Sequence, residues 1–249
     1  MIDNIFRPVS VRRGFEEVLE QFEGAILEGH LSAGDRLPPE RELAAKFGIS
    51  RNSVREALRV FEALGVVKVQ RGAETGGSIV RREPGDAFVQ LLKLYLLLKH
   101  ISIEHVVDML IVISSWAARK VASSPKHEEI AADLGKFVTS MKKSGQKHES
   151  YDEIDAEFHV AVVAAAGNEL ANLVMEGCSS ALRRLIRAPF AESPVWDSIH
   201  NQRVKEHSRI VRAIKSGDAS GAENLMQRHI RTWSDRAIEV ARLNEIPLT

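Results

Sequence analysis

Leu37 to Leu58 read LPPERELAAKFGISRNSVREAL, and this stretch decides the fold of the N-terminal part of the chain. It predicts two short helices joined by a tight turn. Pro38-Pro39 suits the start of the first helix, because a missing N–H costs nothing in a first helical turn. Gly48 is typical of a helix end in the left-handed conformation, and Ser50 can cap the helix that follows.

The two helices, expected over 40–47 and 51–64, each have an apolar face that can pack inward. These faces consist of Leu43, Ala44 and Phe47, and of Val54, Ala57, Leu58, Phe61 and Leu64. The outer face at the start of the second helix carries Arg51, Asn52, Ser53 and Arg55. Such side chains hydrogen-bond base edges and phosphates where a recognition helix enters the major groove. The pattern therefore predicts a helix-turn-helix that binds DNA.

A hairpin is predicted directly after this unit. Residues 66–70 alternate like a strand, 71–77 form a glycine-containing turn, and 78–80 return as a second strand. Such a hairpin is a wing, and Arg71 at its tip can reach into a groove. A small helical domain with a solvated basic face is the alternative. A nucleotide-binding loop is a weaker one, because the glycines have neither the spacing nor the following helix.

The PPERELA run, the SRNSVREAL run and the Arg71-Gly72 wing tip resemble the winged helix-turn-helix of the GntR family of bacterial transcription regulators. The resemblance covers about the first third of the chain. It implies that this region contacts double-stranded operator DNA. The contacting residues implied by the resemblance are Arg41, Arg51, Asn52, Ser53, Arg55, Arg71 and Gly72.

The charge distribution fits a DNA-binding N-terminal region. The whole chain has no net charge, with 34 Lys+Arg and 34 Asp+Glu. Between residues 41 and 82, however, nine basic residues stand against four acidic ones, a local net of +5. A local basic face is what phosphate contact requires. The single cysteine, Cys178, excludes an intramolecular disulfide, and no signal peptide or membrane-spanning run is visible, so a cytoplasmic protein is expected.

The charged, Pro/Gly-containing stretch 81–86 predicts a short linker between two domains. We expect a winged helix-turn-helix of three helices plus a β-hairpin over 1–82, and a second domain over 83–249. In that domain, long helical patterns with short connections predict an antiparallel six- or seven-helix bundle in a mainly α fold. The expected helices lie at about 86–99, 102–123, 126–145, 150–166, 168–188, 194–216 and 218–243.

Possible metal chemistry lies in three of these helices. Asp155 and His159 are four residues apart, so both project from one helical face, where a carboxylate and an imidazole can share a metal ion. His207 and His229 lie in two further helices. Three imidazoles and one carboxylate suit Zn²⁺, or Ni²⁺ or Mn²⁺ with an expanded coordination sphere. Taken alone, each histidine is more typical of a core or surface position.

Three patterns, D-x-x-F-H at 155–159, E-H-x-x-I-x-x-A-I-x-x-G-D at 206–218 and M-x-x-H at 226–229, resemble the FCD ligand-binding domain of the FadR subfamily of GntR regulators. The resemblance implies a divalent metal ion, zinc first and nickel or manganese as alternatives. It also implies a small carboxylate effector at that metal, a homodimer that reads a palindrome, and most often repression. The implied metal ligands are Asp155, His159, His207 and His229.

The chain departs from this subfamily at one place. Members commonly carry an arginine, and a glutamate four residues later, in the first long helix, where this chain has Leu110 and Ser114. Since the arginine is thought to hold an effector carboxylate, we expect a more hydrophobic effector, such as a longer carboxylate. A replacement cation could come from Arg183, Arg184 or Arg187, although these are equally typical of surface residues.

Two other functions are weighed against an effector-responsive regulator. A metal-dependent hydrolase would need a general base such as Glu157 or Glu206, but Glu157 points away from the Asp155–His159 face. No nucleophile elbow or HExxH motif occurs, so an enzyme is not expected. In the second alternative the metal only staples the bundle, and DNA binding does not respond to a metabolite.

Overall fold

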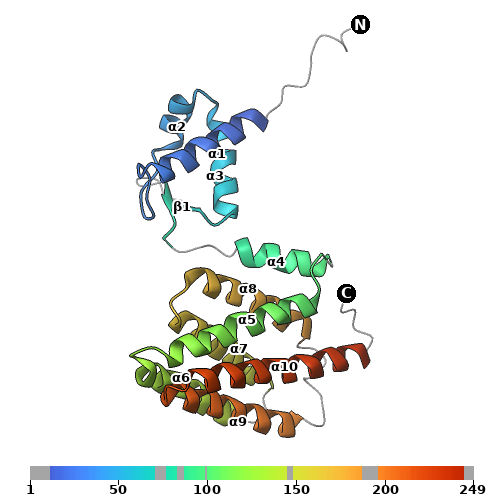
Figure 1. The fold of residues 1–249 in the computed structure, drawn as a ribbon. Coiled ribbons are helices and arrows are strands. Elements are labelled where there is room, and N and C mark those ends of the chain that lie inside the picture. The colour runs from blue at the N-terminus through green and yellow to red at the C-terminus, as the bar shows by residue number, and fades with distance from the viewer. Residues whose placement is uncertain are drawn as a thin grey trace. The chain divides into compact units, whose positions relative to one another are not determined.

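The computed structural model describes residues 12–70, 77–82, 87–98, 100–144, 148–186 and 196–243. Over these residues the chain is mainly α-helical, with one two-stranded sheet (Figure 1). It divides into two compact units, Met1–Phe88 and Val89–Thr249, which are treated separately below. The division expected after residue 82 lies six residues before this one.

The first unit has the predicted order of three helices followed by a hairpin. The turn between the second and third helices is built as expected, because Gly48 has φ 66° and its N–H donates to the carbonyl of Ala44. Ser50 caps the third helix, with its side chain accepting from the N–H of Ser53. The elements are α1 (Arg12–Leu27), α2 (Glu40–Phe47), α3 (Arg51–Ala63), β1 (Val67–Gln70) and β2 (Gly77–Val80).

The core of this unit lies between the three helices and the inner face of the hairpin. Phe22 of α1 stacks on Phe61 of α3, with 4.5 Å between the ring centroids. The expectation that Leu64 packs inward was wrong, since it is 53% exposed. The helix ends at Ala63, and Gly65 follows with φ 74°, so the chain turns away before Leu64 can continue the buried stripe.

The hairpin is antiparallel, with Val67 opposite Val80 and Gln70 opposite Gly77. The segment before α2 adds to it, because the N–H of Leu37 donates to the carbonyl of Ser78 and the N–H of Gly34 to that of Val80. The predicted wing tip, with Arg71 and Gly72, lies outside the described residues.

The second unit is a helical bundle, and each helix lies within about two residues of its predicted ends. Ser102 caps α5 by accepting from the N–H of His105, as the punctuation in the sequence suggested. The helices are α4 (Ala87–Leu97), α5 (Ile103–Ala122), α6 (His127–Ser144), α7 (His148–Ala165), α8 (Glu169–Ile186), α9 (Trp196–Lys215) and α10 (Ala219–Leu243).

Helix α5 lies at the centre of the packing. It runs beside α10 for most of its length (Figure 1) and also contacts α7, α8 and α9. Its buried residues include Ala117 and Ala118, which are fully covered and let neighbouring helices approach closely. None of the described helices is long and apolar enough to cross a membrane. The bundle therefore brings α7, α9 and α10, which carry the predicted ligands, against one central helix.

Candidate metal centre and DNA-binding face

Three helices of the bundle bring Asp155 and three histidines together. Asp155 and His159 come from α7, His207 from α9 and His229 from α10. One ligand atom from each residue lies within 4.8 Å of those of the other three, and all three histidines are buried. We call these four residues the Asp/His cluster. The sequence placed Asp155 and His159 on one helical face, and the tertiary fold adds the other two.

Several ligand atoms of the Asp/His cluster lack a protein partner. Oδ1 of Asp155, Nδ1 of His159 and Nε2 of His207 are buried and accept or donate no hydrogen bond. An unsatisfied buried polar atom costs roughly 1–3 kcal/mol, so three together are expensive. A divalent cation would satisfy all of them at once, and an N₃O donor set suits a borderline metal such as zinc. The residues present therefore fit a metal ion.

Hydrogen bonds fix how two of the rings face the site. The Nδ1–H of His207 donates to the carbonyl of Arg203 at 2.9 Å, which leaves a lone pair on Nε2. That nitrogen lies 3.2 Å from Oδ1 of Asp155, another lone-pair atom. Similarly, Nδ1 of His229 lies 2.7 Å from Oε2 of Glu206. Such partners hold the tautomer and orientation that a metal ligand needs.

The electrostatics keep Asp155, His159 and His229 in the protonation state that binds a metal ion. Burial alone would raise the pKa of Asp155, but the Arg203 guanidinium and the neighbouring histidines together outweigh burial and hold that pKa well below its ordinary value. Burial lowers the pKa of His159 well below its ordinary value, and neighbouring imidazoles add to the effect. Burial and His207 likewise lower the pKa of His229 to about 4, against the opposing effect of Glu206. At neutral pH Asp155 is therefore an anion, and the rings of His159 and His229 are neutral.

Arg203 is part of this site, although the sequence did not single it out. It lies one helical turn before His207 on α9, is 4% exposed, and donates from one terminal nitrogen to Oδ2 of Asp155 at 2.7 Å. Its guanidinium carbon lies 4.0 Å from the ring centroid of Trp233. The only sequence signal was that Arg203 lies four residues before the candidate ligand His207. The same spacing is common for arginines on the exposed face of a helix, so it did not identify Arg203.

The residues expected to line an effector pocket are only partly placed. Leu110 and Ser114 are buried on α5, and the Oγ–H of Ser114 donates to the sulfur of Met175 at 3.8 Å. The two positions thus lie in the bundle interior, on the helix that contacts α7, α9 and α10. The side chain of Arg183 and the whole of Arg187 lie outside the described residues.

Of the predicted DNA-binding residues that the structure describes, Arg51, Asn52, Ser53 and Arg55 lie in the first turns of α3, and Arg41 lies in α2. Arg41, Arg51, Asn52 and Arg55 are exposed, and Ser53 is half-buried. Arg55 is already engaged, because its Nε and a terminal nitrogen donate to Glu40 of α2, the shortest bond being 2.7 Å. This pair ties the two helices together at their outer face. It also presents a fixed guanidinium rather than a freely moving one.

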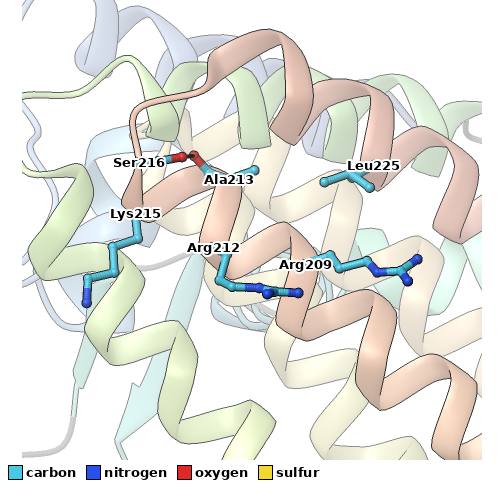
Figure 2. A pocket seen from close by; sticks show the side chains of 6 residues that line it. All are labelled: Arg209, Arg212, Ala213, Lys215, Ser216 and Leu225. Carbon is cyan, nitrogen blue, oxygen red and sulfur yellow. Dashed lines mark hydrogen bonds between the residues drawn. The ribbon is translucent and has the colours of Figure 1, made fainter.

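A separate surface pocket of about 690 Å³ is lined by residues of α9, α10 and the turn between them, and by none of the Asp/His cluster residues (Figure 2). Arg209, Arg212 and Lys215 project from its wall, as the close-up shows. The last two lie in the final turn of α9, where basic side chains interact favourably with the helix dipole. That role accounts for them, and the pocket contains none of the predicted ligands.

Comparisons with known proteins find a matching family for each of the two units. Residues 105–232 match the FCD domain, and residues 15–76 match the bacterial regulatory proteins of the gntR family. The HTH-type transcriptional regulator LutR of Bacillus subtilis is 30% identical over 217 residues, covering 84% of this chain and 94% of LutR. The HTH-type transcriptional repressor NanR of Klebsiella aerogenes is 28% identical over 233 residues, covering 92% of this chain and 86% of NanR. A solved structure, Streptococcus agalactiae GntR, shares the fold with a TM-score of 0.57 at 20% identity, covering 90% of this chain and 98% of that one.

Proposed function

This chain belongs to the GntR family of bacterial transcription regulators and carries an FCD effector-binding domain, and we propose that it is a repressor controlled by a small carboxylate at a metal-containing site. Its relatives are transcription regulators and not enzymes. Repression is supported by the name of the NanR relative. Action on operator DNA implies that the protein works in the cytoplasm.

The observation that carries the proposal is the Asp/His cluster with its three unpartnered buried atoms. Zinc is the first candidate, and nickel or manganese the alternatives, because imidazole and carboxylate ligands accept all three. When bound, the ion would supply a positive centre that an anionic effector can coordinate. Asp155, His159, His207 and His229 would hold it, and Glu206 would orient the ring of His229.

The effector is proposed to be a carboxylate with a hydrophobic body. Leu110 and Ser114 occupy the helix α5 positions where the resemblance leads one to expect an arginine and a glutamate, and both are buried in the bundle. Leu110 offers only apolar contact there, and the hydroxyl of Ser114 already donates to the sulfur of Met175. This favours an alkyl or aromatic acid over a short hydroxy acid, because burying a hydroxyl without a partner is unfavourable.

DNA recognition is proposed to use two copies of the chain, with the start of α3 in the major groove. A homodimer with two-fold symmetry would read a palindrome with its two recognition helices. The exposed Arg51 and Asn52 support base-edge contact at that end of α3. For control, the effector must favour one arrangement of the DNA-binding units, and a coupling of ~1–3 kcal/mol, roughly 5–150-fold in operator affinity, is sufficient.

The main alternative is that the metal ion only stabilises the fold of the bundle and that no metabolite changes the affinity for DNA. Elemental analysis of purified protein, followed by thermal-shift screening of carboxylic acids on metal-loaded and metal-stripped samples, separates the two. We expect about one metal ion per chain and an acid that stabilises only the loaded form. Metal that stabilises the fold without any acid response would favour this alternative. Protein without metal affinity would refute the proposed site.

A further inference from the structure

The guanidinium of Arg203 occupies an unusual place beside the Asp/His cluster. Arg203 is the only buried arginine or lysine among the residues whose burial the structure describes. Its guanidinium carbon lies 4.0 Å from the ring centroid of Trp233 and 5.3 Å from that of Tyr151. Two aromatic rings, one on α10 and one on α7, therefore hold this cation in place beside Asp155.

As a consequence, the two carboxylate oxygens of Asp155 differ in their hydrogen bonding. Oδ2 accepts from Arg203 at 2.7 Å, whereas Oδ1 is buried without a hydrogen-bond partner and lies 3.2 Å from Nε2 of His207. A carboxylate held in this way offers one oxygen to a metal ion and keeps the other for the arginine. Bidentate binding by Asp155 would require breaking a buried, charge-assisted hydrogen bond.

The neighbouring carboxylate is also unable to add a ligand. Oε2 of Glu206 is bonded to Nδ1 of His229 at 2.7 Å, and Oε1 accepts from Gln202 at 2.9 Å. Within the described part of the chain, the ligand set around the Asp/His cluster thus stops at three nitrogens and one oxygen. Any further oxygen ligand has to come from outside the protein.

We propose that Arg203 is a positioning residue that restricts Asp155 to one metal-facing oxygen and thereby reserves coordination for the carboxylate of a monocarboxylic acid. This inference deepens the proposed metal-dependent function and rests on it. The preference for one carboxylate follows because a second, buried one would find no other buried arginine or lysine among the described residues. Arg203 also contributes a permanent positive charge that opposes the metal and favours the acid.

Two substitutions and one control separate this role from simple support of the fold. Arg203→Met removes the charge and the donor but keeps an apolar chain against Trp233, and Arg203→Lys keeps the charge. Arg209→Met is the matched control, since Arg209 is exposed on the same helix. The full-length proteins are stripped of metal and titrated with Co²⁺, whose visible spectrum reports coordination number, alone and with millimolar butyrate or succinate. Chelator competition gives the Co²⁺ affinity.

In the wild type and in Arg209→Met, we expect butyrate to change the Co²⁺ spectrum at lower concentration than succinate. Arg203→Met should have an altered spectrum without any acid, hold Co²⁺ at least roughly tenfold more tightly, and lose the butyrate response, because Asp155 is free to bind with both oxygens. Arg203→Lys should restore part of that response.

Other outcomes identify which idea fails. A wild-type spectrum in Arg203→Met, or weaker Co²⁺ binding there while the wild type binds one ion, overturns the role of Arg203 alone. An equal or stronger response to succinate overturns the monocarboxylate class. Failure of the wild type to bind Co²⁺ overturns this inference together with the proposed metal site.

Discussion

Oε2 of Glu206 lies 2.7 Å from Nδ1 of His229, so a carboxylate on α9 orients a ring on α10. Because an ionised carboxylate only accepts, the proton of the neutral imidazole resides on Nδ1, and Nε2 keeps its lone pair. Burial would raise the pKa of Glu206, but this hydrogen bond and that from Gln202 lower it, so the acceptor stays charged. The tautomer that a metal ligand needs is therefore set by the packing of two helices.

Replacing Glu206 with glutamine should weaken metal binding roughly 10–100-fold, the usual range for loss of a partner that orients a ligating histidine. Chelator competition with Zn²⁺ measures this. Glu157→Gln is the matched control, because Glu157 is an exposed carboxylate on α7 next to the cluster. Equal zinc affinity in both variants would show that the hydrogen bond to His229 has no part in metal binding.

His207→Ala should abolish metal retention and leave operator binding without effector largely intact. His207 is fully buried, and its Nε2 is one of the unpartnered ligand atoms. Elemental analysis and DNA titration of the same preparation check both halves, and His207→Gln guards against the effect of a cavity. If both variants fail to fold, the metal staples the bundle and the sensor proposal loses its support.

The metal-free protein should lose stability as the pH falls from about 6.5 toward 4. Burial lowers the pKa of folded His229 to about 4, below its ordinary value of 6.5. Between these values the unfolded chain binds a proton that the folded chain does not, so acid favours unfolding. The loss from this residue is roughly 2 kcal/mol at pH 5. Urea unfolding at pH 7 and pH 5 tests it, with His229→Gln expected to be less pH-sensitive; identical pH dependence would contradict the assignment.

Arg51→Ala should cost ~1–3 kcal/mol of binding free energy on the operator and weaken discrimination between bases. Arg51 is exposed at the first position of α3, where a recognition helix contacts base edges. Titration against selected operator DNA and against random DNA measures both effects. Lys142→Ala, which removes an exposed charge from α6, is the control. Unchanged binding to both DNAs would refute the placement of Arg51.

Glu40→Gln should change DNA selectivity much more than stability. The Glu40–Arg55 pair is partly exposed, with side chains 35% and 50% accessible, so it should contribute little to the stability of the fold. Removing the acid leaves Arg55 unfixed and the face more positive. We expect tighter binding to random DNA and a smaller ratio of operator to random affinity. A fall in both affinities together would indicate that Glu40 itself supports the fold of the turn.

Most of the secondary structure could be predicted from interactions between residues close together in the sequence. Gly48 and Ser50 bound the turn of the helix-turn-helix through interactions within a few residues, and Ser102 begins α5 in the same way. Such signals are readable without the fold, because a cap and its partner are neighbours in the chain. Leu64 was misjudged for a related reason: the periodic pattern continued, but the helix did not.

Spacing within one helix likewise placed Asp155 beside His159, whereas the meeting of these two with His207 and His229 depends on how α7, α9 and α10 pack. The family resemblance supplied that grouping, and periodicity alone did not.

The chain by itself determined the order of its helices, the turn chemistry and the donor types available, since these depend on residues close together in sequence. Only the tertiary structure decided that Arg203 pairs with Asp155 and Glu206 with His229. Partners 48 and 23 residues apart meet through helix packing, and burial then turns ordinary surface charges into strong, directional interactions.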